Sequence, residues 1–279
     1  MKKKITILYI LALTLSSSLE LSAQSSDSLK PILISFPWSA ESDRANSNFG
    51  NKVATAGDVN GDGYSDVIVS EFNFRNSYDK KEKGRVFVFY GSRTGLSKSP
   101  NWIAKGDQNG GAFGKSASMA GDVNGDGYSD VIIGAYGYND KEGMVFVYYG
   151  SLTGLSKTAN WSAEGNEEKS NFGSSVATAG DVNGDKFSDV IISAEDRVFV
   201  YYGSTNGLSK TPNWSSIGSK NNVYFGNCVS TAGDVNGDGF SDIIIGDFGY
   251  NNEEGMVFVY YGSLIGLSKN CKLTAKGTK

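Results

Sequence analysis

Internal repetition is the feature that most constrains the fold of this 279-residue chain. A unit that begins with a Phe-Gly pair recurs four times, and an aspartate follows each phenylalanine at the ninth position. The four pairs begin at Phe49, Phe113, Phe172 and Phe225. Self-similarity at this spacing is typical of repeat architectures, in which each unit buries its surface against its neighbours.

Each unit contains the pattern of four short β-strands separated by turns. A β-branched run such as Val67-Ile68-Val69 follows the aspartate-rich loop and is apolar on both faces. A second run, VFVFYGS or VFVYYGS, alternates valine with aromatic residues. Gly-Leu-Ser-Lys turns then lead to a tryptophan in three units and to Leu273 in the last. The abundance of glycine, 36 residues, suits this many tight turns.

Sheets that are apolar on both faces can bury themselves by radial stacking, which also protects their edges. The sequence therefore predicts an all-β fold: a β-propeller of four-stranded antiparallel blades, with four blades present from a larger ring of about seven. The competing architecture is a linear β-solenoid, whose rungs are usually much shorter than these units.

The expected organisation has a leader, a closing segment and four blades. These are a signal peptide at 1–23, a short linker at 24–31, a ring-closing strand segment at 32–48, and blades at 49–112, 113–171, 172–224 and 225–279. Phe36-Pro37-Trp38 resembles the tryptophan-bearing fourth strand of a blade, so we expect it to complete the last blade. Because a fourth strand is also expected near Leu273, two segments compete for one place, as they would if further blades had been lost from the C-terminus.

The first residues predict export. Three lysines precede an apolar run from Ile5 to Leu15, and Leu21-Ser22-Ala23 follows as a cleavage signal. The run is too short for a spanning helix, which needs roughly 20 residues, so no transmembrane segment is expected. We predict a secreted or extracellular protein, periplasmic or at the cell surface if the source is bacterial. A formal charge of −4 without a basic cluster argues against nucleic acid as a partner.

The loops after each Phe-Gly pair have the composition of metal sites. They read DVNGDGYSD twice, then DVNGDKFSD and DVNGDGFSD. The side-chain oxygens at positions 1, 3, 5 and 9 and the carbonyl at position 7 can converge on one hard cation, and calcium tolerates this ligand number better than magnesium does. The candidate ligands are Asp58, Asn60, Asp62, Tyr64, Asp66, Asp122, Asn124, Asp126, Tyr128, Asp130, Asp181, Asn183, Asp185, Phe187, Asp189, Asp234, Asn236, Asp238, Phe240 and Asp242.

Two alternatives to calcium binding are weaker. Asp, Asn and Gly cluster in ordinary turns, but four copies in register argue against a plain turn. An EF-hand needs a glutamate at position 12, where these loops already enter a strand, as at Val69 and Ile133. We expect about four calcium ions, with the third site weakest because Lys186 replaces a turn glycine and adds a positive charge.

The Phe-Gly pair, the GDVNGDGYSD loop and the strand that follows resemble the FG-GAP repeats of integrin α-subunit propellers and their bacterial relatives. The resemblance covers roughly residues 32–276, although the second half of the motif is degenerate and contains no proline. It implies calcium loops between the first and second strands of each blade and a role in adhesion or ligand recognition.

Three functions remain open at this point. The first is a non-catalytic extracellular recognition or adhesion module that calcium stiffens; the second is the scaffold of a secreted hydrolase or lyase; the third is a structural spacer. The chain has no histidine and its clustered carboxylates are assigned to metal, so we expect no enzyme activity.

A partner, an extracellular protein or glycan, is expected on the face opposite the calcium loops. The second-to-third and fourth-to-first connections on that face vary in length and carry aromatic residues. These are Phe72, Phe74, Tyr78, Tyr136, Tyr138, Phe248 and Tyr250. Cys228 and Cys271 should lie three strand spacings apart, about 14 Å, which is too far for a disulfide.

Overall fold

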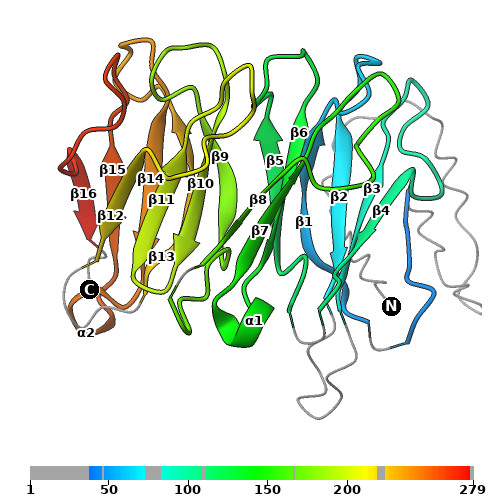
Figure 1. Cartoon of the computed structure of the whole chain (residues 1–279), viewed down its shortest axis with the longest axis horizontal. Helices are drawn as coiled ribbons and strands as arrows, with labels where there is room; N and C mark the ends of the chain where they lie inside the picture. Colours follow the sequence, from blue (N-terminus) through cyan, green and yellow to red (C-terminus); the bar gives the residue numbers. More distant parts are fainter. Residues whose placement is uncertain are drawn as a thin grey trace, which may run out of the picture. The chain divides into compact units, whose positions relative to one another are not determined.

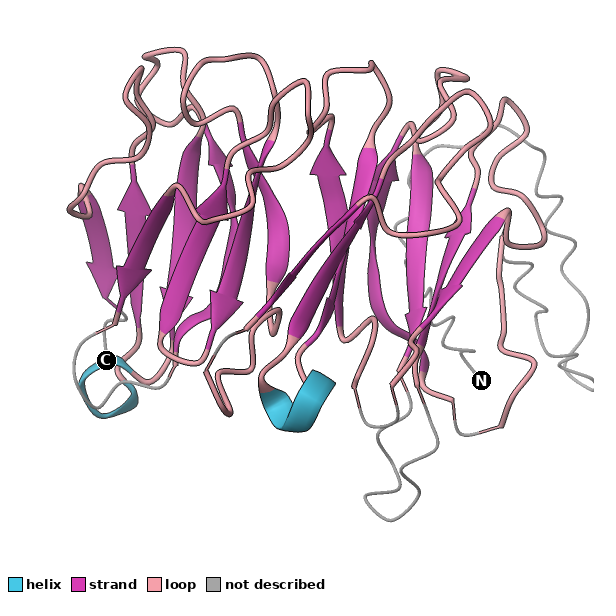
Figure 2. Ribbon diagram, viewed as in Figure 1, coloured by secondary structure: helices cyan, strands magenta, loops and turns pink. Residues whose placement is uncertain are grey.

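The computed structural model describes residues 38–45, 47–72, 83–108, 111–165, 167–218 and 224–276. Within these ranges the chain forms four four-stranded antiparallel sheets and two short helical turns (Figures 1 and 2). The all-β propeller class predicted from the repeats is confirmed, and each sheet is one blade. The predicted signal peptide, the linker and residues 32–37 lie outside the described residues.

The strands follow one another in order across each sheet. Blade 1 contains β1 (Phe49–Gly57), β2 (Asp66–Glu71), β3 (Arg85–Phe89) and β4 (Trp102–Lys105). Blade 2 contains β5 (Ser116–Gly121), β6 (Asp130–Ala135), β7 (Met144–Tyr148) and β8 (Trp161–Glu164). Blade 3 contains β9 (Val176–Gly180), β10 (Asp189–Ala194), β11 (Arg197–Tyr201) and β12 (Trp214–Ile217). Blade 4 contains β13 (Phe225–Gly233), β14 (Asp242–Asp247), β15 (Met256–Tyr260) and β16 (Leu273–Lys276).

The second strand of each blade is buried on both faces, as its composition predicted. In β6 and β10 every residue is buried, because the strand lies between two neighbouring blades. Alternate side chains therefore serve two different cores: Ile132 packs toward blade 3, whereas Val131 and Ile133 pack toward blade 1. In blade 4 the corresponding Ile244 is only half-buried.

The hydrophobic core is divided into clusters that lie between consecutive blades. Val86 and Val88 of β3 meet Val131 and Ile133 of β6 in the first of these clusters. Equivalent clusters join blade 2 to blade 3 and blade 3 to blade 4. Each blade is thus stabilised by burial of apolar area against the next, the driving force expected for stacked repeats.

A tryptophan at the start of the outer strand in blades 1 to 3 packs against the blade that follows. Trp102 of β4 packs edge-on against Tyr148 of blade 2, with ring centroids 4.9 Å apart, and donates a hydrogen bond to the Ser156 carbonyl at 2.9 Å. Trp161 and Trp214 repeat both contacts at the next two junctions. These contacts give a physical reason for the tryptophan that recurs in the first three units.

Trp38 occupies the same kind of place on blade 1. Its ring packs edge-on against Phe89 at 5.2 Å, and its indole N–H donates to the Ser97 carbonyl at 2.9 Å. Segment 38–45 therefore contacts blade 1 as the outer strand of a preceding blade would, although it forms no strand itself. The contacts of Trp38 support the predicted ring-closing role of this segment, and closure of a ring stays a prediction.

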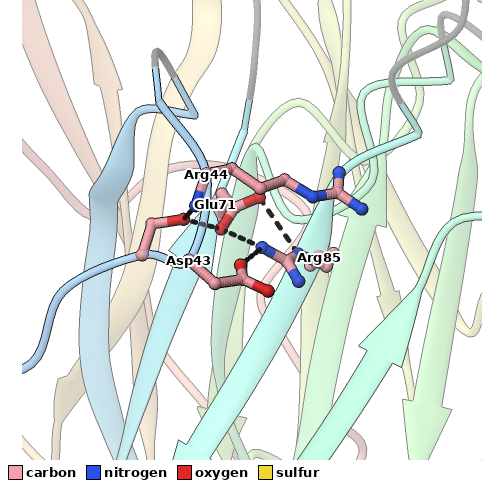
Figure 3. A network of polar contacts seen from close by, with 5 residues as sticks. Asp43, Arg44, Glu71 and Arg85 are labelled. Atoms are coloured by element: carbon pink, nitrogen blue, oxygen red, sulfur yellow. Dashed lines mark hydrogen bonds and ion pairs between the residues drawn. The ribbon is translucent and has the colours of Figure 1, made fainter.

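A polar network also holds this segment against blade 1 (Figure 3). The buried guanidinium of Arg85 donates to Glu71 through Nε and Nη2, at 3.0 and 2.6 Å, and Nη2 also contacts Asp43 Oδ1 at 2.5 Å. Ser42 donates to Glu71 Oε2 at 2.7 Å. The hydrogen bond from Arg85 lowers the pKa of Asp43, so the pair stays charged at neutral pH.

The connections between strands emerge at two opposite ends of the blades. The aspartate-rich loops join the first strand to the second at one end, and helical turns α1 (Tyr138–Lys141) and α2 (Tyr250–Glu253) lie at the other (Figure 1). Both turns contain consecutive residues with positive φ, such as Asn139 at 47° and Asp140 at 54°. The separation of the two ends matches the prediction of a metal-loop face and an opposite face.

The two cysteines are free. Cys228 lies in β13 and Cys271 lies just before β16, at opposite edges of the blade 4 sheet. The strand order on which the prediction of no disulfide rested is confirmed.

Candidate metal centres

The four aspartate-rich loops have the same backbone and the same hydrogen bonds. Each begins directly after a first strand and ends where the buried second strand begins, so the sheet fixes both ends of the loop. Apart from the valine at position 2, which is buried in the first three blades, the residues at positions 1 to 8 are partly or largely accessible, whereas the aspartate at position 9 is 0% exposed in all four blades. The structure thus separates the predicted ligands into an outer group and one buried carboxylate.

The aspartate at position 1 organises the outer part of the loop. In blade 1, Asp58 Oδ1 accepts the N–H groups of Gly61 and Asp62 at 2.7 and 3.1 Å, and Oδ2 accepts that of Gly63 at 2.7 Å. Asp122, Asp181 and Asp234 make the same bonds. These backbone donors, that of Gly239 first, lower the pKa of Asp234, so the carboxylate is held in its charged form.

Positions 3 and 5 are linked to each other. Asn60 Oδ1 accepts the Asp62 N–H at 3.1 Å, and its amide donates to Asp62 Oδ2 at 3.0 Å. Asp62 Oδ1 accepts the Tyr64 N–H at 2.9 Å. The same pattern links Asn124 to Asp126, Asn183 to Asp185 and Asn236 to Asp238. Positions 1, 3 and 5 are therefore brought together in every loop.

The aspartate at position 9 ties the loop to the third strand. In blade 2, Asp130 Oδ2 accepts the Val123 N–H and Oδ1 accepts the Gly150 N–H, both at 2.9 Å. Its equivalents make the same two bonds in the other three blades. The glycine donor was not predicted from the sequence. It is the glycine of the Tyr-Gly-Ser run that follows each third strand, so its recurrence in all four repeats was the available signal.

The buried aspartates lie in an environment that disfavours their charge. Burial raises the pKa of Asp130 to about 7, and the nearby carboxylates Asp126 and Asp122 raise it further, against the opposing effect of the two N–H donors. Asp189 has its pKa raised to about 7 for the same reasons, and that of Asp66 is also raised. A cation bound among the three carboxylates of one loop, such as Asp122, Asp126 and Asp130, would favour their ionised forms.

The residues at position 7 have a further structural role. A Cβ built on Gly61 would lie 2.5 Å from the ring of Tyr128, so this ring lies directly over the loop of the preceding blade. Phe187 and Phe240 cover Gly125 and Gly184 in the same way. Whatever their carbonyls bind, these aromatic side chains hold consecutive loops together.

Most carboxylate oxygens of each loop accept backbone N–H groups, and Oδ2 of the aspartate at position 5 accepts the amide of the asparagine at position 3. Among the described residues, no group of three or more Asp, Glu or Cys side chains is close enough to hold a metal ion. The donor set nevertheless fits calcium, because each loop offers only oxygens, and a carboxylate oxygen that accepts one N–H keeps a second lone pair for a ligand bond. When bound, calcium would neutralise the negative charge of the carboxylates in each loop.

The fold and the loops together define the class of protein. Residues 49–89 and 113–148 match the family model of the FG-GAP repeat, and residues 181–245 match that of an FG-GAP-like repeat. The chain is an FG-GAP repeat protein, and its β-propeller resembles that of integrin α subunits.

Several curated relatives are integrin α subunits. The chain is 32% identical over 205 residues to integrin alpha-4 of Xenopus laevis, an alignment that covers 67% of this chain and 20% of that protein. It is 30% identical over 257 residues to integrin alpha-5 of the same species, covering 83% of this chain and 23% of the relative. Integrin alpha-IIb of Mus musculus is 34% identical over 163 residues, covering 56% and 16%. The chain thus spans about a fifth of the length of these relatives.

Proposed function

We propose that this chain is a secreted, calcium-binding β-propeller that acts as an extracellular recognition or adhesion module. One observation carries the calcium assignment: four loops present the same three carboxylates, and the last of them is a fully buried aspartate that accepts a backbone N–H of its own loop. Export rests on the leader-like sequence at 1–23. No helix within the described ranges is long and apolar enough to cross a membrane.

The ligands that we propose are the same in each blade. Calcium would be held by the side chains at positions 1, 3, 5 and 9 and by the carbonyl at position 7, which in the first loop means Asp58, Asn60, Asp62, Asp66 and Tyr64. Titration of the metal-free protein with calcium in a calorimeter should give about four sites. Absence of calcium binding would leave the loops as hydrogen-bonded turns and would refute the assignment.

Substitution of Lys186 by glycine should strengthen the third loop. Lys186 has a φ of 75°, in the left-handed region, where the other loops have glycine at the same position. Releasing this strain should stabilise the protein by about 1 kcal/mol, and removal of the positive charge should tighten calcium binding at that site. Thermal melts in EDTA measure the change in stability without bound calcium, which we expect from release of the backbone strain at position 186. Calorimetry with calcium measures the calcium affinity of the third loop. A Lys186→Gln variant keeps the side chain without the charge and separates the two effects.

The face opposite the calcium loops is the proposed ligand-binding face, but not all its aromatic residues are available. Phe72 is 4% exposed and lies under the Lys115 ammonium, 5.0 Å from the ring centroid. Tyr138 packs against the core between blades 1 and 2, and Tyr250 packs edge-on against Phe258. Burial raises the pKa of Tyr136. Phe74 and Tyr78 lie outside the described residues. The packing of Phe72, Tyr138 and Tyr250 shows that part of this aromatic set serves the fold.

An exposed aromatic pair and a cavity remain on this face. Phe248 is 51% exposed and Tyr224 is 42% exposed, with ring centroids 4.3 Å apart. In blade 3 the second-to-third connection is only Glu195 and Asp196, and it borders a cavity of about 230 Å³. The cavity is lined by carboxylates, by Arg197 and by the rings of Phe172, Phe199 and Tyr201. A concave surface with an aromatic floor and a polar rim is suited to ligand recognition.

A binding screen tests the proposed function. Purified protein in calcium would be assayed for binding to immobilised matrix proteins, a glycan array and intact cells, together with chromogenic hydrolase and lyase substrates. We expect specific, EDTA-sensitive binding to one of the first three and no turnover. Substrate turnover without binding would favour the alternative, a propeller that supports a hydrolase or lyase site.

Replacement of the exposed aromatic pair should separate binding from folding. A Phe248→Ser and Tyr224→Ser double variant should lose most binding to the ligand found in that screen, by about tenfold or more, because exposed aromatic residues supply much of the contact energy in recognition surfaces. Its melting temperature in calcium should stay close to that of the wild type. The control is Leu152→Ser, at a residue that is 78% exposed on a turn at the metal-loop end. Loss of binding in the control alone would mean that the ligand binds the metal-loop face and would contradict the proposed binding face.

A further inference from the structure

The three junctions between blades share one set of contacts at their centre. The glycine of each Phe-Gly pair packs on a valine of the preceding blade, so closely that a Cβ on Gly114 would lie 2.7 Å from Val86 Cγ2. Gly173 meets Val145 and Gly226 meets Val198 at the same separation. Next to these contacts, Ser116 donates to the Gly173 carbonyl at 2.7 Å across the junction. The Phe-Gly pair therefore fits a groove on the blade before it.

The metal-loop end of each junction is also the same. At the first junction, the N–H groups of Ser129 and Ser151 donate to the carbonyls of Asp58 and Val59 at 3.0 and 3.1 Å. Both bonds recur at the next two junctions. They leave Val59, and likewise Val123 and Val182, 0% exposed. A blade thus presents one face to the blade before it, the leading face, and a complementary face to the blade after it, the trailing face.

The trailing face of blade 4 has the residues of this interface but no partner among the described residues. Val235, the equivalent of Val59, is 52% exposed, and no neighbouring atom lies within 4 Å of the Cβ positions of Gly233 and Gly237. Val257, at the place of Val86, is half-buried. A groove of about 340 Å³ runs past Val257 and Cys228, where the Phe-Gly pair of another blade would fit.

The leading face of blade 1 also exposes residues whose equivalents are buried at the internal junctions. Among the described residues, no neighbouring atom lies within 4 Å of the Cβ position of Gly50, the glycine of the first Phe-Gly pair. Val53 is 61% exposed, whereas its equivalents Val176 and Val229 are 5% and 4% exposed. Trp38 already covers the outer part of this face, where its indole N–H donates a hydrogen bond to the Ser97 carbonyl. The open part is the inner one, around Gly50 and Val53.

We propose that two copies of this chain associate head to tail, with the trailing face of blade 4 of each copy against the leading face of blade 1 of the other. The occupant follows from the three internal junctions, which show that the groove on a trailing face receives a Phe-Gly pair. Blade 1 carries such a pair in the open, and within the part of the chain that the structure describes neither face is covered at these positions. Trp38 keeps its hydrogen bond to the Ser97 carbonyl in the complex, because a leucine side chain, which blade 4 has at the matching place in the sequence, carries no N–H group that could replace the indole.

Mass measurement with two single variants tests this pairing. In sedimentation with calcium present, the wild-type chain should show twice the monomer mass at high concentration and dissociate on dilution. Val53→Glu and Val257→Glu should each be monomeric, because each places a charge in both interfaces of a head-to-tail dimer. A mixture of the two variants should regain a dimer, since one intact face of each remains. The control, Leu152→Glu, should dimerise like the wild type.

The two cysteines provide an independent readout in the same protein. Cys228 lies in the groove of blade 4 and is exposed, whereas Cys271 is half-buried at the junction with blade 3. Labelling of Cys228 by a thiol reagent should slow by about tenfold or more at concentrations where the dimer predominates, because only the dissociated form reacts. Cys271 labelling should not depend on concentration. A monomer at all concentrations, or an association that survives both Val53→Glu and Val257→Glu, would overturn the proposal.

Discussion

Removal of calcium with EDTA is expected to lower the melting temperature of this protein more than any single substitution considered above. A ligand that binds only the folded state stabilises it by about 2.7 kcal/mol at a hundredfold excess over Kd, and each of the four loops would contribute such a term. Two buried aspartates give the reason for this expectation: without a cation, burial and two neighbouring carboxylates oppose the charge of Asp130 and of Asp189.

Thermal melts followed by circular dichroism would measure this effect. Adding calcium back in excess should restore the original curve, and magnesium at the same concentration should restore less of it, because magnesium demands a tighter octahedral site and keeps its waters. If EDTA leaves the curve unchanged, the loops are closed by their own hydrogen bonds and calcium has no structural role.

Substitution of Asp130 by alanine should be the most damaging single change in a loop. The carboxylate is 0% exposed and accepts the N–H groups of Val123 and Gly150. Alanine would leave two buried donors without partners, at a cost of about 1–3 kcal/mol each. One calcium site would be lost in addition.

Asp126→Ala is the matched control, because Asp126 belongs to the same loop and lies at its exposed part. Both variants should bind one calcium ion fewer than the wild type by calorimetry. In EDTA, however, Asp130→Ala should melt well below the wild type and Asp126→Ala close to it. Equal melting of the two variants in EDTA would mean that the bonds of Asp130 to Val123 and Gly150 contribute little to stability.

The fold could be predicted from the sequence because the repeats align with one another. The third strand alternates valine with aromatic residues at the same place in each unit. This pattern predicted a strand that is apolar on both faces, as the structure shows. The recurring tryptophans were placed correctly in the fourth strand, and Trp38 was recognised as their counterpart. Because the pattern recurs in four units, an inference from one unit could be checked against the other three.

The sequence was less informative where a residue's role depends on a neighbouring blade. Nothing in the local sequence distinguishes buried Phe72 from exposed Phe248, because their accessibility depends on the residues that pack over them from other segments. The joining of Arg85 and Glu71 to Asp43 was equally hidden, since Arg85 and Asp43 are distant in the chain. The position 9 aspartate was predicted as a ligand, while its two bonds to backbone N–H groups required the third strand to be in place.

The hydrogen bonds between consecutive blades run in one direction along the array, so the four proposed calcium sites should differ from one another. Each of the first three loops receives backbone bonds and an aromatic cover from the blade that follows it, whereas loop 234–241 receives neither among the described residues. Loss of structure in one blade should therefore weaken the calcium affinity of the blade before it, and that weakening should pass backward along the array. The four blades would then form a one-dimensional cooperative system. In such a system, calcium occupancy of the first loop would depend on the folding of every blade after it.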